Sequence, residues 1–317
     1  MRHHWLPRFY LAGFTDLDVP PPPYEPHLWV YYLEQRSWGK RSPRTLARRS
    51  GYYTLTDASG KPSHDLESLL SRLENQAATL IRTKITDGTP LTDEERRAFA
   101  FFVASMFARV PSLHETWGKF FADIGTDVLA LCHQMYSENP EAFEAVKERY
   151  RQATGKDDLG NLRPEDLDPS LCQIKTRHPV TVAVAFSGIE TFAQTVYQMG
   201  WTFVRAGDGN SFITSDTPVC MFNPKADRSY YGHGLAYTDV EVTLSITRQL
   251  AFLAGWHSQG VRFTSPAPER LVKQVNMRAM LPARQFLIAA KPTFSAAEYL
   301  RSSSEGVSTN PGRRSKE

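Results

Sequence analysis

Residues 65–85 read DLESLLSRLENQAATLIRTKI and decide the character of the middle of the chain. Their apolar residues recur at intervals of three and four, which places them on one side of a helix. The apolar stripe consists of Leu66, Leu69, Leu70, Leu73, Ala77, Leu80, Ile81 and Ile85. Gly88 and Pro90 then interrupt the period. The stretch therefore predicts a long amphipathic helix that packs one face against the rest of the protein.

Three further helices are expected directly after this one. Thr92 and Glu95 have the spacing of a capping box, in which each side chain accepts from the backbone N–H of the other residue. The helix that they open is expected to end at Pro111. Residues 111–136 keep a helical period, and residues 140–154 begin with proline and stop before a glycine. The sequence thus predicts a helical middle.

The flanking parts of the chain favour strands. Leu28–Leu33 is rich in aromatic and β-branched residues, and Gly207–Asn210 reads GDGN, a turn signal that predicts a hairpin between its flanking strands. Strands are expected over 28–33, 179–186, 201–206, 211–216, 240–247, 250–256 and 284–290, with helices over 189–199 and 268–280. We therefore predict an α+β fold: a helical bundle in the middle, packed against a mostly antiparallel sheet formed by N-terminal and C-terminal strands.

The size and composition indicate a globular body with a short polar tail. The 317 residues, 41% of them hydrophobic, suffice for one large core, and we expect a single domain over residues 1–301. Residues 302–317 are mostly Ser, Gly, Pro and charged residues, so we expect them to be disordered. No apolar run approaches the ~18 residues of a membrane span, and the N-terminus lacks the apolar core of a secretory signal. A soluble protein is expected.

The cysteines argue against both a disulfide framework and a zinc site. Cys132, Cys172 and Cys220 are odd in number, and no two of them have C-x-x-C spacing. We interpret them as buried or incidental thiols of a protein in a reducing compartment, which makes the cytoplasm the expected location.

One segment of the chain concentrates positive charge. The chain as a whole has 37 basic and 34 acidic residues, a net charge of +3, which by itself does not indicate a nucleic-acid partner. The stretch from Arg36 to Arg49 nevertheless contains six basic residues and no acidic one: Arg36, Lys40, Arg41, Arg44, Arg48 and Arg49. Such a run can bind an anionic ligand or nucleic acid, or it can be a solvated face or a mobile loop. Both interpretations stay open.

The common catalytic signatures are missing from the sequence. It contains no H-E-x-x-H, no G-x-S-x-G and no Rossmann glycine set. Gly155-Lys156 lacks the glycine that a phosphate loop needs five residues earlier, because position 150 is tyrosine. Any catalytic residues must therefore come from separate parts of the chain.

Several stretches, taken in order, nevertheless form a recognisable set. They include HHWLPRFYL at residues 3–11, FARVP at 107–111, FITSDTPV at 212–219 and Val275-Asn276. This set resembles the domain-of-unknown-function family 4238, a family of uncharacterised bacterial proteins, over residues 3 to about 290. Thr217 stands where that family usually has asparagine, and Leu244-Ser245 lacks the two prolines usual there. The resemblance implies kinship, and it carries no established activity, cofactor or partner.

We predict that His4, Glu74, Arg109 and Asp216 are catalytic. His4 matches a family position, and its imidazole suits a general base, a metal ligand or a structural anchor of the chain start. Glu67 and Glu74 lie on one side of their helix. A carboxylate at the edge of an apolar stripe is costly unless it is paired, and Arg109 is the expected partner of Glu74, either as a structural ion pair or as the orienting group of an active-site acid.

Asp216 ends an otherwise apolar strand, just before Pro218. Its carboxylate is expected either at an exposed strand tip, where sites are often built, or in an Asx-type turn that accepts from nearby backbone N–H groups. Substrate-binding roles are predicted for Arg8, Ser215 and Asn276, which belong to the matching stretches.

Two classes of function remain open at this point. In the first, the protein is a metal-assisted or acid–base hydrolase that acts on phosphodiesters. His4, Glu74 and Asp216 would then hold metal or water, while Arg109 and the Arg36–Arg49 run meet an anion. In the second, the protein binds a ligand or partner without catalysis, and the same polar residues brace the junction of helices and sheet. The sequence names neither metal ligands nor a cofactor.

Overall fold

The computed structural model describes residues 2–15, 25–56, 61–223, 234–235, 237–257 and 259–292, and the chain divides into two compact units. The first unit comprises Met1–Leu113 and Ala185–Glu317, and the second comprises His114–Val184. The single domain expected over residues 1–301 stays a prediction. The tail expected to be disordered, residues 302–317, lies outside the described residues.

The first unit contains the strands of the described chain. In chain order they are β1 Arg2–His4, β2 Leu28–Tyr32, β3 Ser37–Arg41, β4 Arg48–Ser50, β5 Leu55–Thr56, β6 Pro62–Ser63, β7 Gly200–Ala206, β8 Thr214–Ser215, β9 Val219–Phe222, β10 Glu241–Thr247, β11 Leu250–Gly255, β12 Val261–Ala267 and β13 Phe286–Ala289. Its helices are α1 Arg8–Ala12, α2 Asp65–Leu80, the π-helical turn η1 Ile81–Ile85, α3 Asp93–Ala108, α7 Ile189–Gln198 and α8 Glu269–Met280. The fold is α+β, as predicted.

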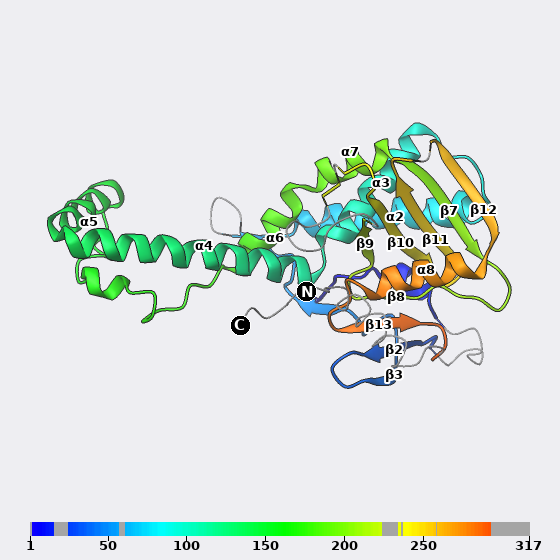
Figure 1. The fold of residues 1–317 in the computed structure, drawn as a ribbon, viewed down its shortest axis with the longest axis horizontal. Helices are drawn as coiled ribbons and strands as arrows, with labels where there is room; N and C mark the ends of the chain where they lie inside the picture. Colours follow the sequence, from blue (N-terminus) through cyan, green and yellow to red (C-terminus); the bar gives the residue numbers. More distant parts are fainter. Residues whose placement is uncertain are drawn as a thin grey trace, which may run out of the picture. The chain divides into compact units, whose positions relative to one another are not determined.

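The larger sheet has the strand order β12-β7-β11-β10-β9, and only the pair β12–β7 is parallel. Successive side chains of a strand point to opposite faces, so each strand supplies both faces of the sheet. Phe203 of β7 and Phe252 of β11 face α3, where their rings lie 5.5 and 5.3 Å from that of Phe99. Their neighbours Val204 and Ala251 belong to a buried cluster with residues of α8. Helices therefore cover both faces of this sheet (Figure 1).

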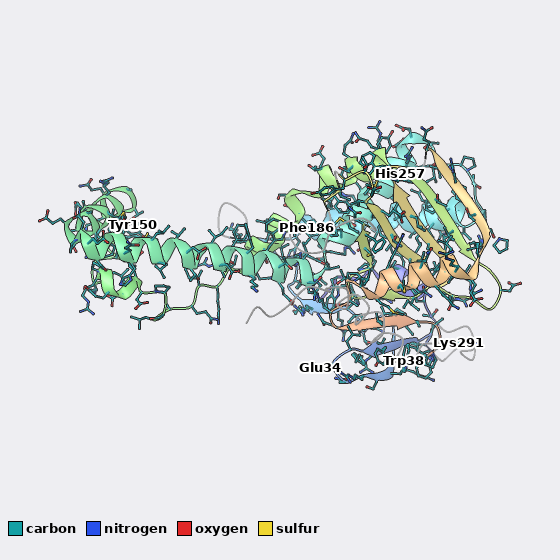
Figure 2. The ribbon with its side chains drawn as sticks, viewed as in Figure 1. Glu34, Trp38, Tyr150, Phe186, His257 and Lys291 are labelled. Atoms are coloured by element: carbon teal, nitrogen blue, oxygen red, sulfur yellow. The ribbon has the colours of Figure 1, made fainter. Side chains whose placement is uncertain are left out.

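The smaller sheet joins the two ends of the chain, as the sequence predicted. Its strand order is β3-β2-β13-β8, and all three pairings are antiparallel. Trp38 on β3 (Figure 2) packs against Tyr31 on β2 with a ring separation of 5.3 Å. Tyr31 also belongs to a buried cluster with Leu287 of β13. N-terminal and C-terminal strands thus share one core.

Helix α3 begins where its local signal places it. The Thr92 side chain accepts from the Glu95 N–H, and the Glu95 carboxylate accepts from the Thr92 N–H, which confirms the capping box of α3. The helix then buries a run of large side chains, namely Phe99, Phe102, Val103 and Met106.

The stretch 179–186, predicted as a strand, is instead the helix α6 His178–Ser187. Its β-branched residues favour a strand only weakly, because such preferences depend strongly on packing. Thr181, Val182 and Ala185 are buried while Val180 is 46% exposed, a pattern with helical rather than strand spacing. The strand prediction was wrong because packing outweighed local preference.

The hairpin predicted around Gly207–Asn210 is also absent. The turn itself forms, since the Asn210 N–H donates to the Gly207 carbonyl, but β7 and β8 belong to different sheets. The turn that joins β10 to β11 lies between the end of β7 and the segment that leads into β8. Ala206 N–H donates to the carbonyl of Gln249 and Phe212 N–H donates to that of Arg248, at 3.0 and 2.8 Å. The β10–β11 turn therefore accepts backbone hydrogen bonds from Ala206 and Phe212, in place of a direct pairing between the segments on either side of Gly207–Asn210.

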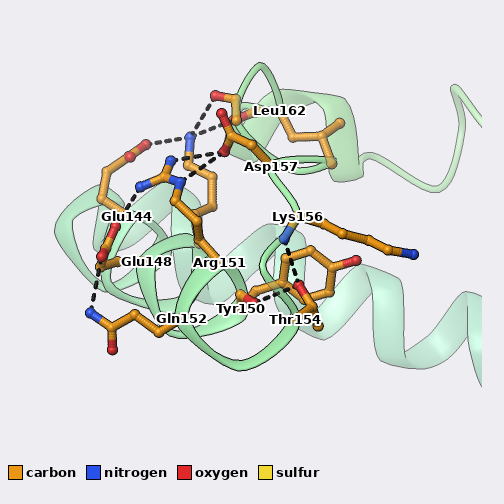
Figure 3. Close-up of polar contacts among 11 residues, drawn as sticks. Glu144, Glu148, Tyr150, Arg151, Gln152, Thr154, Lys156, Asp157 and Leu162 are labelled. Atoms are coloured by element: carbon orange, nitrogen blue, oxygen red, sulfur yellow. Dashed lines mark hydrogen bonds and ion pairs between the residues drawn. The ribbon is translucent and has the colours of Figure 1, made fainter.

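The second unit is helical. It contains most of α4 Pro111–Glu138 and α6, together with α5 Pro140–Thr154 and the 3-10 turn η2 Pro164–Leu167. Lys147 of α5 donates to the carbonyl of Leu162 at 3.0 Å, and Arg151 contacts Asp157 at 2.8 Å (Figure 3). These contacts attach the segment after α5 to that helix. None of the described helices combines the length and apolar character needed to cross a membrane.

Candidate acid–base site

A cavity of about 260 Å³ in the first unit is lined by residues of β1, α1 and α2. Its polar lining comes from His3, His4, Arg8, Tyr53, Glu67, Ser71, Glu74 and Asn75. Three of the seven residues predicted for the site are among them: His4, Arg8 and Glu74. Arg109 does not line the cavity, but it donates a hydrogen bond to Glu74. The structure therefore brings four of the predicted residues together.

The N-terminal segment is held firmly in the body of the protein, and this positions the first residues of the site. Strand β1 pairs antiparallel with β4, with His4 opposite Arg48. Proline at position 7 precedes α1, whose Tyr10 is almost fully buried. The Tyr10 hydroxyl lies 2.6 Å from Thr214 Oγ1 and donates to the Ser245 carbonyl at 2.8 Å. His4 and Arg8 therefore project from a short, anchored strand–helix unit.

His4 is held in the tautomer of a general base. Its Nε2 lies 3.1 Å from the carbonyl oxygen of Arg44, which can only accept, so Nε2 carries the proton. Burial lowers the pKa of His4, and the nearby charges of Arg8 and Arg48 lower it further, whereas the Arg44 hydrogen bond and Glu74 raise it. The neutral ring consequently has its lone pair on Nδ1, where it can take up a proton.

Glu74 and Arg109 form the ion pair that the sequence predicted. Arg109 Nη1 donates to Glu74 Oε1 at 2.8 Å, and the Arg109 side chain is completely buried whereas that of Glu74 is 27% exposed. Nε and Nη2 of Arg109 make no hydrogen bond among the described residues, so Glu74 is the group that compensates its charge there. The Tyr53 hydroxyl donates to the Arg109 carbonyl and fixes the backbone at this point. Arg109 thereby orients a carboxylate that lines the cavity.

His3, His64 and Glu67 bring three potential metal-ligand atoms within 4.8 Å of one another. The Tyr53 backbone N–H donates to His3 Nδ1 at 2.8 Å, so the neutral ring carries its proton on Nε2. That nitrogen lies 2.8 Å from Glu67 Oε2, without the geometry of a hydrogen bond, and carries a proton rather than a lone pair. The arrangement fits a histidine–carboxylate pair and opposes metal coordination through His3.

A family model described as "Protein of unknown function (DUF4238)" matches residues 2–293 of the chain. The chain belongs to this family. No curated protein and no solved structure matches it. The matched region includes every residue of the cavity described above.

The other three predicted residues of this DUF4238 protein lie outside the cavity lining, in hydrogen bonds that support the fold. Asp216 is 1% exposed, and its two oxygens accept from the backbone N–H groups of Arg284 and Gln285 at 3.0 and 3.1 Å. Burial raises the pKa of Asp216, whereas those backbone hydrogen bonds lower it. This geometry favours the structural interpretation of Asp216 over an exposed strand tip.

Ser215 and Asn276 have equally local partners. Ser215 Oγ donates to the Thr217 carbonyl and accepts from the Thr217 N–H, which closes a tight turn. Asn276 of α8 accepts from the Ile213 N–H and donates to the Ser211 carbonyl, both at 3.0 Å. Asn276 thus attaches α8 to the segment before β8. Substrate binding by these two residues stays a prediction.

His3 and Tyr53 are among the cavity residues that were not predicted for the site. His3 belongs to a stretch that carries the family resemblance, but no local pattern pairs it with Tyr53. Their rings stack at a centroid distance of 5.7 Å, and the Tyr53 N–H selects the His3 tautomer. Fifty residues separate the two, so their contact is a product of tertiary structure.

Proposed function

We propose that this DUF4238 protein is a hydrolase of phosphodiesters that works by acid–base catalysis in the cavity lined by β1, α1 and α2. One observation carries the proposal. His4, in the tautomer of a base, lies in one cavity with a carboxylate held by Arg109 and with the cationic Arg8. These three groups come from three different elements of the chain.

Each group has a defined task in this reaction. His4 Nδ1 takes a proton from water, and the resulting hydroxide attacks the phosphorus of the diester. Glu74 stabilises the imidazolium that forms, because its charge raises the pKa of His4. Arg8 binds a non-bridging oxygen of the phosphate. When the phosphorus–oxygen bond to the leaving group breaks, protonated His4 returns its proton to that oxygen, so one water and one diester yield a monoester and an alcohol.

The test is hydrolysis of bis(p-nitrophenyl) phosphate by the full chain, followed through release of p-nitrophenolate. We expect His4→Gln to lose at least about 100-fold in rate, within the range typical of general-base removal, while its thermal unfolding is preserved. His257→Gln is the matched control, because the His257 side chain is 72% exposed and does not line the cavity. The two variants should therefore differ sharply.

Three outcomes would contradict this proposal. A rate that is the same for His4→Gln and the unmutated chain would show that His4 is not the base. Loss of activity on chelation, with recovery on adding a divalent ion, would replace acid–base catalysis by a metal-assisted reaction. Binding of the diester without turnover, abolished by Arg8→Gln, would favour the alternative of a non-catalytic binding protein.

We further propose that the protein acts in the cytoplasm. Its three cysteines are free thiols, Cys220 buried and Cys172 exposed. An exposed free thiol is most stable in a reducing compartment. Fractionation of cells that produce the protein would test the location, and recovery in an oxidising compartment would contradict it.

A further inference from the structure

A second cavity, of about 420 Å³, lies in the first unit and shares no lining residue with the proposed active site. It is bordered by the turn between β2 and β3, by residues 45–48 and by residues 284–286. Three arginines line it: Arg41, Arg48 and Arg284. Among the described residues, none of the three forms an ion pair with a carboxylate. With Glu34 as the acidic residue of its lining, the cavity has a net positive charge.

Backbone contacts position these three arginines, and none of these contacts neutralises a guanidinium charge. Arg41 Nη1 donates to the Lys40 carbonyl at 2.8 Å, and its guanidinium lies 5.4 Å from the Tyr32 ring. Arg48 lies on β4, paired with β1. The backbone N–H of Arg284 donates to the buried carboxylate of Asp216 at 3.0 Å. The structural role of Asp216 thus includes fixing one wall of this cavity.

The rest of the lining suits a planar group with hydroxyls. Trp5, Tyr32 and Phe286 supply aromatic surface. The Trp5 side chain is nearly buried, and its indole N–H has no acceptor among the described residues. Glu34, in the turn between β2 and β3 (Figure 2), is the carboxylate of the lining. Aromatic walls, guanidinium donors and a carboxylate acceptor are together the complement of a ring, a phosphate and hydroxyl groups.

We propose that this cavity binds a phosphorylated ligand with a planar ring, of the chemical class of a nucleoside monophosphate. The arginines bind the phosphate, the aromatic side chains contact the ring, and Glu34 accepts from hydroxyls of the sugar. The volume lies within the range of ~300–1,000 Å³ typical of small-ligand sites. This assigns a ligand to two members of the basic run, Arg41 and Arg48, together with Arg284, and it stands independently of the proposed hydrolase activity.

Calorimetric titration of the full chain with adenosine 5′-monophosphate tests the proposal. Adenosine and inorganic phosphate are titrated in parallel, and both should bind at least about tenfold more weakly, because each lacks one half of the ligand. Arg48→Gln and Arg284→Gln should each weaken binding of the monophosphate by about tenfold or more. Arg36→Gln is the matched control, since Arg36 belongs to the same basic run but does not line the cavity.

Thermal unfolding of each variant accompanies the titrations, and Arg48→Lys separates loss of the fold from loss of the contact. Lysine keeps the charge, so a folded Arg48→Lys chain should bind more tightly than Arg48→Gln. Absence of binding up to millimolar monophosphate would overturn the proposal. So would equal weakening by Arg36→Gln, or tighter binding of a single-stranded oligonucleotide than of the monophosphate, because both point to a diffuse nucleic-acid surface.

Discussion

Glu74 on α2 accepts a hydrogen bond of 2.8 Å from Arg109, 35 residues later at the end of α3, whose side chain has no solvent exposure. A buried cation of this kind is tolerated only when a partner compensates it. The pair therefore links the packing of α2 on α3 to the position of a carboxylate in the cavity. The stability of the fold and the proposed catalysis therefore both depend on the side chains of Glu74 and Arg109.

Glu74→Gln should destabilise the protein strongly. The neutral amide leaves the Arg109 charge buried without its partner, and breaking such a pair costs about 3–5 kcal/mol. Glu269→Gln is the matched control: Glu269 pairs with Lys273 on the surface of α8, where water screens both charges, so its loss should destabilise the protein far less. Urea denaturation of both variants measures the difference. Equal and small losses would show that water reaches Arg109.

Stability should fall as the pH is lowered below neutrality. The pKa values of His3 and His4 are both lowered from 6.5, chiefly by burial. Below pH 6.5 the unfolded chain therefore takes up protons that the folded chain does not, so each histidine stabilises the fold at higher pH and loses that contribution as the pH falls. The slope should reach up to ~1.4 kcal/mol per pH unit for each histidine.

Melting temperatures measured between about pH 7.5 and about pH 5.5 check this dependence. His3→Gln should flatten the profile. A profile of the unmutated chain that is flat over this range would contradict burial of His3 and His4 in their neutral forms.

Asp216→Asn should lower stability and leave phosphodiester hydrolysis unchanged. Both carboxylate oxygens accept backbone N–H groups, from Arg284 and Gln285. An asparagine must place its own NH₂ group against one of these donors, at a cost of about 1.5–3 kcal/mol. Asp208→Asn, in an exposed turn, should change stability by less than about 0.5 kcal/mol. Lost activity in a folded Asp216→Asn chain would instead restore Asp216 to the catalytic set.

A chain that starts at Thr15 should be insoluble or far less stable than the full chain. The missing segment includes Leu6, Leu11 and Phe14, all fully buried, together with Tyr10. Burial of each such side chain stabilises the fold by about 1.5–3 kcal/mol, and its removal also exposes the apolar surface beneath. Solubility and thermal unfolding measure the effect. An unchanged melting temperature would show that the N-terminal segment does not contribute to the core.

The sequence by itself determined those features whose causes lie within a few residues. Thr92 and Glu95 are three positions apart and cap α3 reciprocally, as predicted. Asn139 caps α5, and Gly155 ends it in the left-handed conformation, which glycine adopts without steric cost. The need of Glu74 for a partner was also visible, because a helical period places it at the edge of the apolar stripe. Such short-range signals can be read from the sequence, because they depend little on which other segments pack nearby.

Only the tertiary structure decided the features that depend on remote groups. The corner between β10 and β11 separates β7 from β8, and packing turns residues 178–187 into a helix. Asp216 has backbone donors almost 70 residues away, and the tautomer of His4 depends on a carbonyl 40 residues away. Burial and hydrogen bonding at these positions are set by which segments meet. That choice depends on the packing free energy of the whole chain, which no local pattern of residues contains.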